Sequence, residues 1–146
     1  MASEHAILQS AYALIAARFR RGVHILAQPD LLETFLRVRL GALRRATFGV
    51  LFLDRTHRLI EFTEMFGGTI DRVQVHAREV MRDAMACDAE AVLCVRSDPV
   101  GNAEPTRFDL ADARRVVRAM TLIDVPVLDY LILGSTITSL AQRRQI

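Results

Sequence analysis

Residues 51–80 read LFLDRTHRLIEFTEMFGGTIDRVQVHAREV, and their pattern is the strongest indication of the fold. Its first residues complete an apolar run, TFGVLFLD (47–54), which predicts a central strand. DRTH (54–57) predicts a turn, and RLIEFTEMF (58–66) alternates as expected of a strand that pairs back on the first. Gly67 and Gly68 follow at once and end the second strand. The stretch therefore predicts two neighbouring antiparallel strands.

The sequence downstream continues as alternating helices and strands. After a short extended piece near Val73 and Val75, helices are predicted at 77–87 and 106–123, and strands at 89–95, 125–133 and 135–140. Gly134 divides the last two strands.

Two amphipathic helices are predicted upstream of the sheet. The first carries a stripe of Leu8, Tyr12, Ile15 and Phe19. The second begins at about Asp30, as its N-cap, and carries Leu31, Phe35, Val38 and Ala42 on one face. The order ααββαβαββ predicts a three-layer α/β fold, in which helices cover a mixed sheet.

Composition indicates a globular protein of one domain. The 146 residues are 51% hydrophobic and 25% charged, which suffices for one core but not for two. Two cysteines, Cys87 and Cys94, without a signal peptide upstream predict reduced thiols and a cytoplasmic location. No apolar stretch approaches the roughly 20 residues that a membrane-spanning helix needs, so we expect no membrane association.

The basic residues are all Arg, which is typical of a GC-rich bacterial genome. Residues 1–45 contain seven Arg and three acidic residues, a net charge of +4, whereas the remaining residues have a net charge of −2. A basic segment containing Arg18, Arg20 and Arg21 could contact nucleic acid. The solvated face of two amphipathic helices explains the same charges, and this is the interpretation that we favour.

The chain resembles the RadC-like domains, which are members of the JAB/MPN (JAMM) superfamily. Their pattern is Leu-Phe-Leu-Asp, then a glutamate shortly before Phe-x-Gly-Thr, then Val-His-Pro-Arg-Glu; here 51–54 read LFLD, 64–69 read EMFGGT and 75–79 read VHARE. DVPVLDYLILG (124–134) is similar to their closing strand, which usually ends Leu-Asp-His-x-Ile-x-Gly. The resemblance implies a three-layer α-β-α, cytidine-deaminase-like domain at 25–146, behind an amino-terminal amphipathic helix at 1–24.

The resemblance also implies a position for a zinc site. Active members bind zinc through His-x-His-Pro and the Asp of a downstream Ser-x-x-Asp, with the upstream Glu as general base. Three protein ligands leave one tetrahedral position for a water, whose pKa the metal lowers to about 7. In this chain Arg96, Ser97 and Asp98 stand at His-x-His, Thr106 and Asp109 stand at the Ser and the Asp, and Glu64 stands at the general base.

These substitutions predict a degenerate metal site. Zinc favours nitrogen and sulfur donors, so Asp98 and Asp109 alone form a poor ligand set. A fixed cation about 4 Å from a divalent ion costs on the order of 8 kcal/mol, against about 10–16 kcal/mol for a full structural zinc site. We therefore expect the guanidinium of Arg96 to replace the metal and to pair with Asp98, Asp109 or both.

Structural roles explain the same residues without catalysis. Thr106 and Asp109 form the pattern of a helix capping box, and Glu64 reads as an inward polar residue beside Arg96. We expect His76 to lie at a helix start, while His5, His24 and His57 lie outside the candidate site. No two His have metal-binding spacing, so the sequence offers no second zinc site.

We therefore expect a non-catalytic scaffold or interaction protein that needs no cofactor. One alternative is a JAMM-type metallopeptidase or isopeptidase that holds zinc through Asp98, Asp109 and water. Another is a nucleic-acid-binding protein, which the family's customary association with DNA repair suggests. The stripe on the amino-terminal helix lies ahead of the resembling region, so it either folds back onto the domain or meets a second copy of the chain. Of these two outcomes we expect the homodimer. Binding to a different protein is a further alternative that the sequence leaves open.

Overall fold

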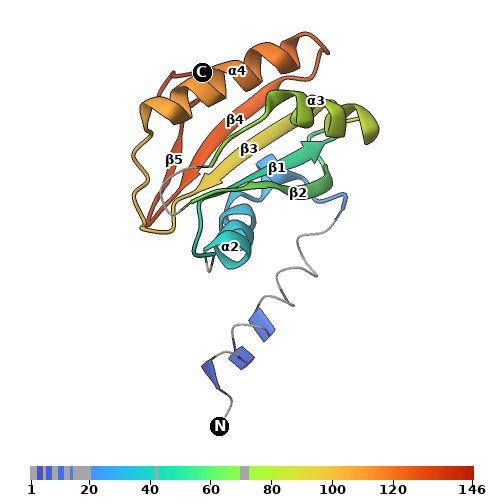
Figure 1. Cartoon of the computed structure of the whole chain (residues 1–146). Coiled ribbons are helices and arrows are strands. Elements are labelled where there is room, and N and C mark those ends of the chain that lie inside the picture. Colours follow the sequence, from blue (N-terminus) through green and yellow to red (C-terminus); the bar gives the residue numbers. More distant parts are fainter. Residues whose placement is uncertain are drawn as a thin grey trace.

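The structure is a computed structural model of the whole chain, and it describes residues 3–4, 6–7, 10–11, 14, 21–41, 43–69 and 73–146 (Figure 1). The stripe predicted on the amino-terminal helix, Leu8, Tyr12, Ile15 and Phe19, lies outside these residues, as do His5, Arg18, Arg20 and Ala42. The predictions that rest on them therefore stay predictions.

The described elements follow the predicted order, and the predicted α/β fold is confirmed. They are η1 (Ile25–Ala27), α2 (Pro29–Leu40), β1 (Thr47–Leu53), β2 (Leu59–Gly67), α3 (Ala77–Ala86), β3 (Ala91–Ser97), α4 (Arg107–Thr121), β4 (Val127–Leu133) and β5 (Ile137–Ser139). The short 3-10 helix η1 was not predicted. No helix in the described part of the chain is long and apolar enough to cross a membrane.

The five strands form one mixed sheet in the order β2-β1-β3-β4-β5. Only β3 and β4 are parallel, and α4 connects them, because parallel neighbours need a crossover. The register pairs Thr47 with Gly67 and Ser97, and Ser97 with Leu133. One end of the sheet therefore gathers the start of β1 and the ends of β2, β3 and β4.

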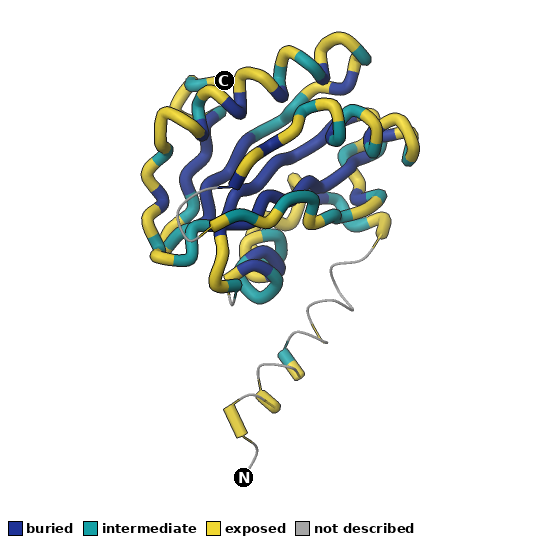
Figure 2. The backbone as a smooth tube through the Cα atoms, viewed as in Figure 1, coloured by how far each residue is buried: buried dark blue, intermediate teal, exposed yellow. Residues whose placement is uncertain are grey.

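Helices cover both faces of the sheet, as Figure 1 shows. Phe48, Val50 and Phe52 of β1 pack on the face covered by α3 and α4, whereas Leu51 and Leu53 pack on the face covered by α2. Successive side chains of a strand point to opposite faces, so the unbroken apolar run of β1 contributes to both cores. The two central strands β1 and β3 are accordingly buried along their whole length (Figure 2).

Most predicted boundaries differ from the observed ones by one or two residues, and two of these differences are informative. Helix α2 begins at Pro29 with Gln28 as its N-cap, so Asp30 lies in the first turn instead of at the N-cap. Proline suits the first helical position, because its fixed φ is already helical and its missing N–H needs no partner there. Strand β3 continues to Ser97, two residues beyond the predicted end, and so carries Arg96 within the sheet.

The loop between β3 and α4 packs closely against the turn that follows β4. The N–H of Asp98 donates to the Leu133 carbonyl at 2.8 Å, and that of Ser135 donates to the Gly101 carbonyl at 2.7 Å. A Cβ at Gly134 would lie 2.6 Å from the carbonyl oxygen of Gly101, so only glycine fits there. Arg37 of α2 donates to the Gly134 carbonyl at 2.9 Å. The loop is therefore held on a rigid support.

Candidate functional site

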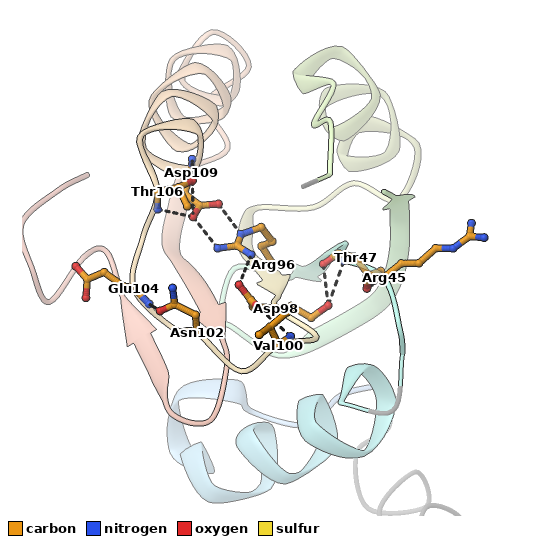
Figure 3. Close-up of polar contacts among 10 residues, drawn as sticks. Arg45, Thr47, Arg96, Asp98, Val100, Asn102, Glu104, Thr106 and Asp109 are labelled. Carbon is orange, nitrogen blue, oxygen red and sulfur yellow. Dashed lines mark hydrogen bonds and ion pairs between the residues drawn. The ribbon is translucent and has the colours of Figure 1, made fainter. Parts of the chain in front are cut away.

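Arg96 lies at the end of β3 with its side chain buried between the sheet and α4 (Figure 3). Its register partners are Phe48 on β1 and Ile132 on β4. Alternation along β3 places Arg96 on the same face as Cys94, which packs in the core covered by α3 and α4. A charged group at this place needs a partner, because a buried and unpaired charge is very costly.

That partner is Asp109, in the first turn of α4. The guanidinium donates from Nε to Asp109 Oδ1 at 2.5 Å and from Nη2 to Oδ2 at 2.7 Å. Both residues are buried, with 4% of Arg96 and 3% of Asp109 exposed. Two parallel hydrogen bonds between a guanidinium and a carboxylate form the strongest kind of protein ion pair.

Asp109 also caps its own helix. Its Oδ2 accepts from the backbone N–H of Thr106 at 2.8 Å and from the Thr106 hydroxyl at 3.1 Å. The Thr106 hydroxyl oxygen accepts from the Asp109 N–H at 3.1 Å, so the predicted capping box is confirmed. Both carboxylate oxygens of Asp109 are thus engaged by Arg96 and Thr106.

Asp98 completes the cluster from the loop. Its Oδ2 lies 3.5 Å from Nη1 of Arg96, and its Oδ1 accepts from the N–H of Val100 at 2.9 Å. The second contact is an Asx turn, which shapes the loop after β3. The prediction that Arg96 pairs with Asp98, Asp109 or both agrees with these contacts, and Asp109 is the closer partner.

The environment keeps the guanidinium of Arg96 charged. Burial acts to lower its pKa, but the hydrogen bonds and charge of Asp109, together with the charge of Asp98, outweigh burial and raise the pKa above its ordinary value. Arg96 therefore acts in this cluster as a permanent cation and hydrogen-bond donor.

Glu64 does not lie beside Arg96, and this expectation was wrong. A bulge in β2 places Glu64 opposite Gly49 and leaves Met65 as an extra residue. Met65 packs against the core on the α3 and α4 side, so Glu64 falls on the face of α2. There its Oε1 accepts from Nε of Arg39 at 2.7 Å.

Three further residues, on α4 and β4, were not singled out by the sequence. Arg115 of α4 donates from Nη2 to Asp112 at 2.6 Å and to the Val75 carbonyl at 2.9 Å, which ties α4 to the segment before α3. Asp112 is buried three residues after Asp109. An acidic residue within the apolar stripe of a helix could have indicated this buried carboxylate.

Tyr130 of β4 is the third of these residues. It is fully buried, and its hydroxyl has no hydrogen-bond partner in the described part of the chain. Burial is the main cause that raises its pKa well above the usual value, with Cys94, Asp109 and Asp112 adding to the shift. The phenol therefore stays neutral. It stands where the closing strand of the family usually has His, so comparison with that pattern was the signal for it.

The histidines that the structure describes, His24, His57 and His76, make no contact with this cluster. His76 is the N-cap residue of α3, as predicted, and its ring contacts Phe66 edge-on at 5.5 Å between centroids. His24 caps η1 by accepting from the Ala27 N–H at 3.2 Å, and His57 lies in the turn between β1 and β2. Among the residues that the structure describes, no three His, Cys, Asp or Glu side chains come together as a metal site does.

The zinc ion that the resemblance implies does not fit these donors. The guanidinium of Arg96 occupies the side of Asp109 that a metal would need, and a cation beside a divalent ion repels it. Asp109 could bind a metal only after losing its contacts to Arg96.

A shallow cleft of about 400 Å³ lies near this end of the sheet and is lined in part by Arg44, Arg45 and Thr47.

Known proteins resemble the chain over most of its length. A model of the RadC-like JAB domain matches residues 26–145. Two UPF0758 proteins of Vibrio cholerae are 37% and 38% identical to it, over 97% and 96% of this chain and 89% and 88% of theirs. A UPF0758 protein of Thioalkalivibrio sulfidiphilus is 41% identical, over 94% of this chain and 61% of that relative. By this match, the chain belongs to the RadC-like JAB domain family.

Proposed function

We propose that this chain is a non-catalytic member of its family, which acts as a scaffold or binding protein. The observation that carries the proposal is the buried, two-point ion pair of Arg96 with Asp109. In this interpretation the guanidinium takes the position that active relatives give to zinc. Arg96 of β3 then supplies the positive charge that a metal would otherwise supply to the surrounding carboxylates.

The chemistry of hydrolysis supports this proposal. A zinc hydrolase needs three ligands, a free coordination position for water and a nearby base. Here Arg96 cannot act as a ligand, since a guanidinium has only donors. The carboxylate of Glu64 belongs to the face of α2 and pairs with Arg39. The Thr106 hydroxyl is engaged in the helix cap. None of these residues is placed to activate a water.

Metal content and metal-dependent stability test the proposal. Protein purified without chelator should contain well under one equivalent of zinc, and EDTA should leave its Tm unchanged. The double variant Arg96→His/Asp98→His should acquire about one equivalent, because two imidazoles then join Asp109. Its control, Arg96→His/Asp98→Asn, offers one imidazole and should bind zinc much more weakly.

The same experiment distinguishes the alternative. Stoichiometric zinc in the unmodified protein, removed by EDTA with a fall in Tm, would contradict the proposal and favour a peptidase with Asp98 and Asp109 as ligands. Under our proposal, the double variant binds zinc without gaining peptidase activity, because Glu64 lies on the other face of the sheet.

A further inference from the structure

The outer face of α4 carries a row of arginines without an acidic neighbour on the same helix face. At about 100° per residue, Arg107, Arg114 and Arg118 lie within about 40° of one another around the helix axis. All three are exposed, as is Arg115 beside them. The two acidic residues of α4, Asp109 and Asp112, are buried. The helix therefore presents positive charge alone to solvent.

The arginines of the other described helices have carboxylate partners that this row lacks. In α2, Arg37 pairs with Glu33 at 3.1 Å and Arg39 pairs with Glu64 at 2.7 Å; in α3, Arg82 pairs with Glu79. Within the described residues, no carboxylate pairs with Arg107, Arg114 or Arg118, and the guanidinium of Arg107 lies over the Phe108 ring. Three charges of α4 are thus uncompensated.

We propose that this row, Arg107, Arg114 and Arg118, binds the phosphate backbone of a nucleic acid. The first and last of these residues are eleven positions apart, so the row is about 16 Å long at about 1.5 Å per residue. Duplex DNA carries one charge per about 1.7 Å of its axis, so about ten phosphate charges lie along that length. The proposal concerns a different surface from the Arg96 cluster and does not depend on it.

The chemistry of the row favours nucleic acid over the other acidic partners. An interfacial membrane helix needs a broad apolar face to insert, whereas the exposed large apolar residues here, Phe108 and Leu122, lie at opposite ends of α4. Protein interfaces rely on aromatic and arginine anchors that fill well-packed pockets at their centre, and the centre of this row has arginines but no aromatic residue beside them. A uniform polyanion needs no such anchor.

Binding of a fluorescein-labelled 20-base-pair DNA duplex of mixed sequence, followed by anisotropy at several salt concentrations, tests the proposal. Three phosphate contacts predict that log K falls with log salt with a slope of about −3. The variant Arg107→Gln/Arg114→Gln/Arg118→Gln should bind about tenfold or more weakly in 50 mM salt, with a slope near zero. Gln keeps the helix propensity of Arg, and circular dichroism checks the fold.

The control variant Arg44→Gln/Arg45→Gln/Arg55→Gln removes the same charge from exposed residues on either side of β1. It should retain most of the affinity. Equal losses in the two variants would overturn the proposal, because net charge alone would then explain binding. Loss only on Arg18→Gln/Arg20→Gln/Arg21→Gln would assign binding to the amino-terminal segment. Binding to vesicles with anionic lipid but not to DNA would also overturn it.

Discussion

Replacement of Arg96 by methionine tests the strength of the buried ion pair. Arg96→Met keeps an unbranched apolar side chain but removes two charge-assisted hydrogen bonds, each worth about 1.5–3 kcal/mol, to a carboxylate that is 3% exposed. Breaking a buried pair from one side costs about 3–5 kcal/mol. Thr106 still donates to Asp109, so we expect the lower end, about 3 kcal/mol, and a fall in Tm of about 6–12 °C.

The control is a similar pair on the surface. Arg143 donates to both carboxylate oxygens of Glu104, at 2.9 and 3.3 Å, with 43% and 67% of the two side chains exposed. Arg143→Met should leave the free energy of unfolding close to that of the unmodified protein, since solvent screens exposed pairs. Urea unfolding at pH 7 measures both variants.

Equal costs for Arg96→Met and Arg143→Met would refute the argument that the pair stabilises the fold through a buried charge.

Two further predictions concern other parts of the chain. Tyr130→Phe should leave stability at pH 7 unchanged or slightly higher, because it removes a buried hydroxyl that has no partner among the described residues. The pKa of Tyr130 is raised in the folded protein, so above pH 10 the unfolded chain loses the phenol proton first and the unmodified protein loses stability. Tyr130→Phe should reduce this loss, and unchanged alkaline unfolding would contradict the argument. The chain should sediment as a dimer and a version lacking residues 1–22 as a monomer, and identical sedimentation of the two would remove the argument for the amino-terminal stripe.

The sequence predicted those features that depend on neighbouring residues. The apolar run of β1, the turn at 54–57 and the capping box of Thr106 with Asp109 all lie within short segments. The place of Arg96 at the end of β3 was predicted from the family's His-x-His motif, which also lies within a short segment. Its pairing with Asp109 was predictable because a buried guanidinium at that place has few other means of neutralisation.

The features that the sequence missed depend on contacts between distant segments. One extra residue in β2, Met65, moves Glu64 to the other face of the sheet, and alternation alone does not reveal where a strand bulges. The hydrogen bond from Arg115 to the Val75 carbonyl joins residues 40 positions apart. No pattern within either segment indicates that contact.

The double role of Asp109 has a consequence for how this protein can evolve. The residue is at once the counterion of Arg96 and the cap of α4, so its replacement disturbs both. A lineage that acquired two histidines at these positions one at a time would pass through a chain with a buried carboxylate and no cation if Arg96 changed first. It would pass through a chain with the cation and an incomplete ligand set if Asp98 changed first. At about 3 kcal/mol, the first intermediate forfeits a large share of the 5–15 kcal/mol by which proteins are typically stable. The ion pair therefore penalises the order in which Arg96 is replaced first, whereas replacement of Asp98 first leaves the pair with Asp109 intact.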